Sequence, residues 1–163
     1  MPTDIPPAIR SFWAAFQSTA PAGLTPRFYE AFYFADSESV ANELAELVLA
    51  GTKRATAGLL WAFEAENKSP PSPGDLSVVT NWRGRPLCVI QTETVSTVPF
   101  EEVTELFAAT EGEGDGSLRY WREAHWAYFG RECQRIGRKP NPRMAIVCEE
   151  FSVVYRAVDE TAA

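Results

Sequence analysis

Apolar residues recur at three- and four-residue intervals along much of this chain, which is the spacing of an amphipathic helix. The pattern predicts helices over residues 8–19, 37–50, 57–66 and 117–136, and a further helix opened by Pro99-Phe100. The helix over 37–50 has the clearest ends. Asp36 or Ser37 suits its N-cap, and Gly51 suits the left-handed residue beyond its C-terminus.

Runs rich in aromatic and β-branched residues predict strands between these helices. They cover residues 28–34, 76–82 and 87–98, and residues 143–155 form one or two further strands. Arg83-Gly84-Arg85-Pro86 separates the second run from the third with turn-forming residues, so this pair reads as a hairpin. The interspersed helices and strands lack a strict βαβ rhythm, which indicates one α+β domain with a small, mostly antiparallel sheet.

The composition is that of a globular protein. The chain has 163 residues, and 45% of them are hydrophobic, which suits one domain with a substantial core. Its formal net charge of −7 argues against tight binding to duplex DNA or long RNA, because these polymers attract positive charge. A small nucleotide, or a short single strand in a locally basic cleft, stays compatible with this charge.

Cysteine and histidine are too few and too scattered for a structural zinc site or a disulfide framework. Cys88, Cys133 and Cys148 lie far apart, and His125 is the one histidine. We therefore expect a cytoplasmic protein with no cofactor and no metal site built from cysteine and histidine. The N-terminus shows no signal-peptide pattern, and no run of about 18 apolar residues predicts a membrane span.

The segment after Gly51 concentrates polar chemistry at the end of a helix. Lys53 and Thr56 stand three residues apart, which places both side chains on one face of a turn, and Arg54 lies between them. A lysine beside a hydroxyl can orient a phosphate or a carbonyl, and a desolvated lysine can activate the hydroxyl as a nucleophile. The alternative is a solvated lysine that stabilises the end of the helix dipole.

An acidic loop, Glu111-Gly112-Glu113-Gly114-Asp115, supplies carboxylates. One of them near Lys53 could hold the ammonium or act in acid–base catalysis. Their oxygens also suit a hard cation such as Mg²⁺, so a divalent cation stays open. The alternative is an ordinary solvated loop.

Basic and aromatic residues suggest contacts with single-stranded nucleic acid. Arg131 and Arg135 share a helical stripe, and Tyr120 and Trp121 lie on the same helix. Trp82 and Arg85 on the hairpin turn could stack a base and bind a phosphate. The alternatives are a solvated helix face and a tryptophan that closes the end of a barrel.

Together these motifs resemble the ASCH superfamily, and most closely its small single-domain bacterial members. The matching segments, in family order, are Leu44–Thr56, Pro73–Leu76, Pro86–Ile90, Glu111–Asp115, Ser117-Leu118 and Trp121-Arg122. The resemblance implies a PUA-like small β-barrel flanked by helices. It divides the chain into an N-terminal helical segment (1–27) packed on the domain, the ASCH domain (28–156) and a loose tail (157–163). One departure is Phe34-Ala35-Asp36, where family members commonly have Phe-Gly-Asp.

The resemblance also implies a function connected with RNA. Related small members include amidohydrolases that deacetylate N4-acetylcytidine with a lysine, a threonine and a glutamate. These match Lys53, Thr56 and most naturally Glu111, with Glu113 close by. Other members are ribonucleases acting on single-stranded RNA. The sequence therefore leaves three functions open: nucleoside amide hydrolysis, RNA cleavage, and RNA or nucleotide binding without catalysis. The oligomeric state also stays open.

Overall fold

A five-stranded sheet forms the centre of the computed structural model, which describes residues 4–19 and 27–158. The strands are β1 (Arg27–Phe32), β2 (Ala55–Leu59), β3 (Asp75–Thr80), β4 (Pro86–Pro99) and β5 (Ala145–Arg156). The helices are α1 (Arg10–Thr19), α2 (Glu38–Leu49), α3 (Leu60–Ala65), α4 (Glu105–Glu111) and α5 (Leu118–Arg135), with short 3-10 helices at Pro7–Ile9 and Phe100–Glu102.

The sheet is mixed and open. Its strand order is β1-β3-β4-β5-β2, with β1 parallel to β3 and every other neighbouring pair antiparallel. The predicted α+β class is confirmed. Closure into a small barrel is not confirmed, because β1 and β2 lie at opposite edges and no ladder joins them within the described residues. Register shifts after Val89 and Thr92 bend the long β4–β5 pair without bringing these two edges together.

The segment predicted as a helix over residues 57–66 is half strand. Ala55 to Leu59 pair with β5, and the helix begins only at Leu60. The apolar spacing of this segment fits a helix, but pairing with β5 overrides that local preference. Gly58 allows the close return of α3, because a Cβ at this position would lie 2.7 Å from the ring of Phe63.

Most other elements agree with the sequence pattern. The hairpin of β3 and β4 is confirmed, and the C-terminal segment is one strand rather than two. Gly51 follows α2 with a φ of +80°, as its position predicts. Ser117 caps α5 through its hydroxyl, which accepts a hydrogen bond from the backbone N–H of Tyr120.

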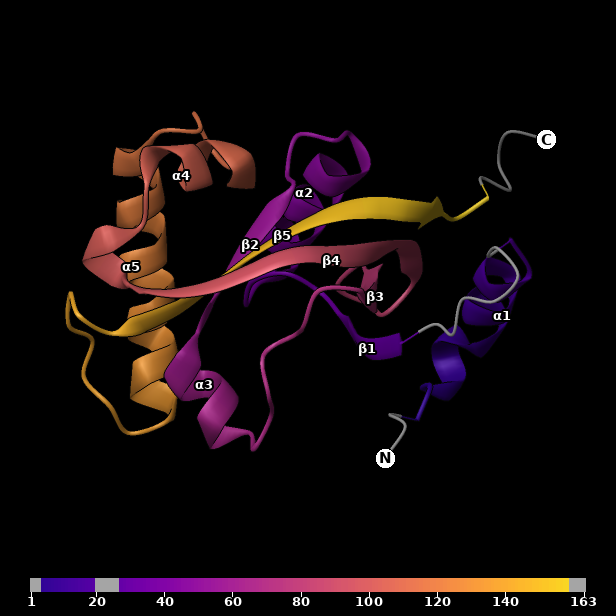
Figure 1. Ribbon diagram of the computed structural model, residues 1–163, viewed down its shortest axis with the longest axis horizontal. Coiled ribbons are helices and arrows are strands. Elements are labelled where there is room, and N and C mark those ends of the chain that lie inside the picture. The colour runs from indigo at the N-terminus through magenta and orange to yellow at the C-terminus, as the bar shows by residue number, and fades with distance from the viewer. Residues whose placement is uncertain (1–3, 20–26, 159–163) are drawn as a thin grey trace.

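Three hydrophobic clusters attach the helices to the sheet. α1 packs on β3 and β4, α2 packs on the central strands, and α5 packs on β2 and β5. Figure 1 shows α4 and α5 at one end of the molecule and α1 at the other, with β4 and β5 running between them. Trp13 and Phe16 anchor α1, so the described part of the N-terminal segment is packed on the domain.

The C-terminal region continues beyond β5 for a short distance. The backbone N–H of Ala157 donates to the carbonyl of Leu87. Residues 159–163 of the predicted tail lie outside the described residues. None of the described helices has both the length and the hydropathy needed to cross a bilayer.

Candidate functional site

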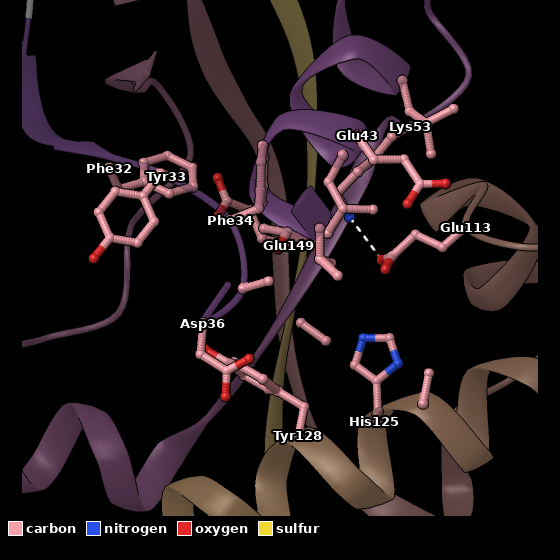
Figure 2. Close-up of a pocket in the computed structure, with 18 of the residues that line it drawn as sticks. Phe32, Tyr33, Phe34, Asp36, Glu43, Lys53, Glu113, His125, Tyr128 and Glu149 are labelled. Atoms are coloured by element: carbon pink, nitrogen blue, oxygen red, sulfur yellow. Dashed lines mark hydrogen bonds and ion pairs between the residues drawn. The ribbon is translucent and has the colours of Figure 1, made fainter. Parts of the chain in front are cut away.

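A cavity of about 430 Å³ opens between the sheet and α5. Its wall is formed by the end of β1, the chain leading into α2, the start of β2, the acidic loop and one face of α5. Figure 2 shows Lys53 and Glu113 on one side of the cavity, His125 and Tyr128 on α5, and Phe32 to Asp36 on the opposite side. The volume is within the range of small-molecule sites.

Lys53 is a buried cation at this cavity. The chain turns after α2 as the N–H groups of Thr52 and Lys53 both donate to the carbonyl of Leu47. This turn directs the Lys53 side chain inward, where it is only 2% exposed. Its Nζ donates to the carbonyl of Ala55 at 2.7 Å and lies 5.1 Å from the centre of the Phe34 ring. The alternative of a solvated lysine is therefore wrong.

Two carboxylates balance this cation. Nζ of Lys53 lies 3.0 Å from Oε2 of Glu113 and 3.5 Å from Oε2 of Glu111. α4 ends at Glu111, and Gly112 then adopts a φ of +65°, which turns the chain so that both acids reach the lysine. Glu113 lines the cavity with its side chain 14% exposed, whereas Glu111 is fully buried behind it. The acidic loop is thus part of the site and not an ordinary solvated loop.

His125 completes the charged cluster from α5. Its Nδ1 lies 2.9 Å from the carbonyl of Trp121, and its Nε2 lies 3.2 Å from Oε2 of Glu111. A carbonyl and a carboxylate both accept hydrogen bonds, so both contacts are favourable when each ring nitrogen carries a proton. The imidazole ring also stacks on Trp121, with the ring centres 4.2 Å apart.

The four groups shift one another's pKa values. Burial opposes the charge on Lys53, but Glu111 and Glu113 outweigh it and raise the pKa of the ammonium. Burial also favours a neutral Glu111, but Lys53 and His125 lower the pKa of this carboxyl well below its usual range. Burial, together with the nearby charge of Glu111, raises the pKa of Glu113 to about 7. Near neutral pH, Lys53 and Glu111 are therefore ionised, whereas Glu113 is protonated in part of the molecules.

The pKa of His125 is also raised. Burial lowers it, but the contact with Glu111 outweighs the burial. This direction agrees with the two hydrogen-bond acceptors that face the ring.

Thr56 and Glu149 meet on the strand side of the cavity. They are directly opposite each other in the antiparallel pair of β2 and β5, and both line the cavity. Oγ1 of Thr92 donates to Oε2 of Glu149 at 2.7 Å. Burial raises the pKa of Glu149 to about 7. The cavity therefore contains a hydroxyl, an ammonium and two carboxyl groups that titrate near neutral pH.

Of the predicted binding residues, three line the cavity. They are Glu113, Tyr120 and Arg131. Arg131 is already paired, because its Nε lies 2.7 Å from Oδ2 of Asp36 on the opposite side of the cavity. Tyr120 is 41% exposed and remains accessible to a ligand.

The other predicted binding residues lie away from the cavity lining. Trp121 was expected to contact substrate but is a core residue, 2% exposed, because its position on α5 faces the sheet. Trp82 packs on Tyr33, with the ring centres 4.6 Å apart, at the hairpin turn. Arg135 pairs with Glu132 on the surface of α5. Arg54 and Arg85 are exposed and do not line the cavity.

Sequence reasoning missed three residues of the site: Asp36, His125 and Glu149. His125 reads as a core histidine because it occupies the apolar stripe of its helix. Glu149 falls within a strand whose facing direction depends on pairing with β2, which was not predicted. The alternation of side-chain directions along β5 was the available signal for Glu149. Glu149 stands two residues after the buried Val147, so the two side chains point to the same face of the sheet.

The cluster also has a donor set that could coordinate a metal. Glu111, Glu113 and His125 each bring one potential ligand atom within 4.8 Å of the others. The ammonium of Lys53 contacts both carboxylates and supplies a positive charge at the same place. A metal ion here would have to compete with this internal cation.

The fold and the cavity define a small α+β domain with a cluster of charged side chains at its main cavity. The chain matches the ASCH domain family over residues 30–155 and belongs to that family. Its structure is similar to the crystal structure of an ASCH domain from Lactobacillus crispatus JV V101, with 37% identity, a TM-score of 0.88 and coverage of 94% of this chain and 98% of the other.

Two further solved structures are similar. One is a protein from Enterococcus faecalis V583, with 29% identity, a TM-score of 0.83 and coverage of 96% of this chain and 93% of the other. The second is the hypothetical protein PH0355, which at 16% identity, a TM-score of 0.52 and coverage of 78% and 99% supports the fold alone. No curated protein is similar enough to this chain to count as a relative.

Proposed function

We propose that this protein hydrolyses an amide on a modified pyrimidine nucleoside of the N4-acetylcytidine type. One observation carries the proposal: a buried, charged lysine lies at the same cavity as a threonine hydroxyl and a carboxyl group that titrates near neutral pH. A fixed cation in a desolvated site stabilises the oxyanion that forms when a carbonyl is attacked. The cavity volume suits one nucleoside better than a structured RNA.

The geometry supports distinct roles for the three groups. Thr56 supplies the nucleophilic hydroxyl. Lys53 stabilises the oxyanion and does not act as the base, because its two carboxylate partners raise the pKa of its ammonium. Glu113 donates a proton to the leaving amine, since it faces the cavity and its pKa of about 7 keeps it partly protonated. Glu111 holds Lys53 and His125 in place from behind.

Single-stranded RNA is a second candidate substrate. Tyr33 and Tyr120 line the cavity and are 44% and 41% exposed, so their rings are available to stack on bases next to the one in the cavity. The predicted basic track along α5 is weaker support, because Arg131 pairs with Asp36 and Arg135 pairs with Glu132. A short strand that presents one modified base agrees better with this site than cleavage of the RNA backbone.

The test is turnover of N4-acetylcytidine, followed by chromatographic separation of cytidine from the substrate. We expect the wild type to release cytidine and acetate, and Thr56→Val to lose this activity. Lys53→Met should lower kcat/KM by at least about 10²-fold, as loss of one oxyanion donor does. Thr52→Val is the matched control, because Thr52 is exposed, does not line the cavity and should keep full activity.

Three results would count against this function. Absence of turnover by the wild type removes it. Full activity in Thr56→Val removes the proposed nucleophile. Binding of cytidine or short RNA without any turnover would instead favour a non-catalytic reader of nucleosides or RNA.

A further inference from the structure

The proposed hydrolysis requires a base for the Thr56 hydroxyl, and we propose that Glu149 is that base. This inference rests on the proposed function and adds a catalytic residue to it. Lys53 is unsuited to the task because it stays protonated between Glu111 and Glu113. Glu113 is held at the ammonium of Lys53 and is needed in its protonated form for the leaving group.

The sheet places Glu149 next to Thr56. The two residues are direct partners in the antiparallel ladder of β2 and β5, and both line the same cavity (Figure 2 labels Glu149 among the lining side chains). Side chains directly opposite in such a pair have Cβ atoms about 4.5–5.5 Å apart, on the same face of the sheet. A glutamate side chain is therefore long enough to reach the threonine hydroxyl without movement of the backbone.

A second contact holds the Glu149 carboxylate. Oγ1 of Thr92 on the neighbouring strand β4 donates to Oε2 of Glu149 at 2.7 Å. Within the described residues the carboxylate of Glu149 accepts no other hydrogen bond, so its Oε1 is available to Thr56. Thr92 thus anchors one carboxylate oxygen, and the second oxygen is left to accept the proton of the neighbouring Thr56 hydroxyl.

The surroundings of Glu149 bring the pKa of its carboxyl group close to neutral pH. Burial raises the pKa of Glu149 to about 7, and the hydrogen bond from Thr92 opposes this shift. The ionisable groups around it are Tyr29 and Glu30 on β1, Asp75 on β3, Lys53 before β2, and, across the cavity, Glu113 and His125. A base of this strength is ionised in part of the molecules and accepts a hydroxyl proton readily.

The reaction then balances as two half-reactions. Oγ1 of Thr56 forms a bond to the amide carbonyl carbon while its proton moves to Glu149, and Lys53 stabilises the oxyanion. The carbon–nitrogen bond breaks, and the amine leaves with a proton from Glu113. Water next attacks the acyl-threonine ester and transfers a proton to Glu113, which the first half-reaction left ionised. Glu149 returns its proton to Oγ1 of Thr56 as the ester bond breaks, which releases acetic acid and restores Thr56 and both glutamates to their starting states.

The matched pair for the test is Glu149→Gln and Glu150→Gln. Glu150 is the next residue of β5, and its Oε2 likewise accepts a hydrogen bond from a threonine, Thr94 of β4, at 2.8 Å. It faces the other side of the sheet and does not line the cavity. We expect kcat/KM for N4-acetylcytidine to fall by about 10²- to 10⁴-fold in Glu149→Gln, the usual range for a general base, and to be unchanged in Glu150→Gln.

The pH profile separates a base from a structural role. A base must be ionised, so wild-type kcat/KM should fall as the pH decreases through about 7, the raised pKa of Glu149. The residual activity of Glu149→Gln should lack this acid limb. In Thr92→Val, the limb should move to higher pH, because the hydrogen bond that lowers the pKa of Glu149 is gone.

Each alternative outcome has a distinct meaning. If the wild type is active and Glu149→Gln is as active as Glu150→Gln, the role of Glu149 is overturned and the proposed function stands. The same holds if Glu149→Gln is slow but keeps the acid limb of the wild type. If the wild type shows no turnover, the proposed function is overturned, and this inference with it.

Discussion

Replacement of Lys53 by methionine tests whether the charged cluster of Lys53, Glu111 and Glu113 is shielded from water, as its burial indicates. Methionine keeps most of the side-chain volume but removes the ammonium that lies 3.5 Å from Glu111 and 3.0 Å from Glu113. At an effective dielectric constant of about 20, one such pair at this separation attracts by about 5 kcal/mol. The substitution also removes the cost of burying the ammonium, so the net effect is smaller than the attraction from both acids. We expect Lys53→Met to lower the free energy of unfolding by about 3–5 kcal/mol, the usual cost of breaking a buried ion pair.

The loss of stability in Lys53→Met should increase with pH. In the wild type, the pKa of Glu111 is held below its unfolded value, so the ionised carboxylate stabilises the fold at neutral pH. Without the ammonium, burial raises the pKa of Glu111 above its unfolded value, and the stability of the variant decreases as the pH rises through that folded pKa. The difference between Lys53→Met and wild type should therefore be larger near about pH 8 than near about pH 5.

Urea unfolding at both pH values measures this difference. Adding Glu111→Gln to Lys53→Met should restore at least about 2 kcal/mol at the higher pH, because it removes the unpaired buried charge. Arg119→Met is the control, since Arg119 forms an exposed pair with Glu123 on α5 and should change stability by less than about 1 kcal/mol. The desolvated cluster would be refuted if Lys53→Met lowered the free energy of unfolding by less than about 1 kcal/mol. It would also be refuted if adding Glu111→Gln restored no stability.

Two further predictions concern the frame of the site. Gly112→Ala should destabilise the protein by more than about 1 kcal/mol, because Gly112 has a φ of +65° and a Cβ there would lie 2.2 Å from the carbonyl oxygen of Thr52. Gly116→Ala should cost less in the same urea assay, since φ is +76° but no atom lies within 4 Å of the added carbon. Asp36→Ala removes the partner of Arg131, an exposed pair, so thermal unfolding should show a change below about 1 kcal/mol. A larger loss would mean that this pair holds the two sides of the cavity together.

The sequence predicts the elements whose signals are local. The spacing of apolar residues and the Ser117 cap define α5, and the turn between β3 and β4 defines the hairpin. The strand β2 is different, because its five residues gain their conformation from pairing with β5, which lies about ninety positions away along the chain. Closure of a sheet into a barrel likewise depends on which edge strands pair with each other, and no local sequence pattern determines that pairing. The barrel was expected from the family resemblance alone.

The same distinction separates the predicted from the missed site residues. Lys53, Thr56 and Glu113 lie in or beside turns whose composition marks them, and all three line the cavity. Glu149 was missed because its role depends on the register between β5 and β2, and a shift of one residue would turn its side chain to the other face. That dependence is itself informative: the register that brings Glu149 beside Thr56 also sends Glu150 to the opposite face. The sheet therefore selects which of two adjacent, chemically identical side chains can act on the hydroxyl.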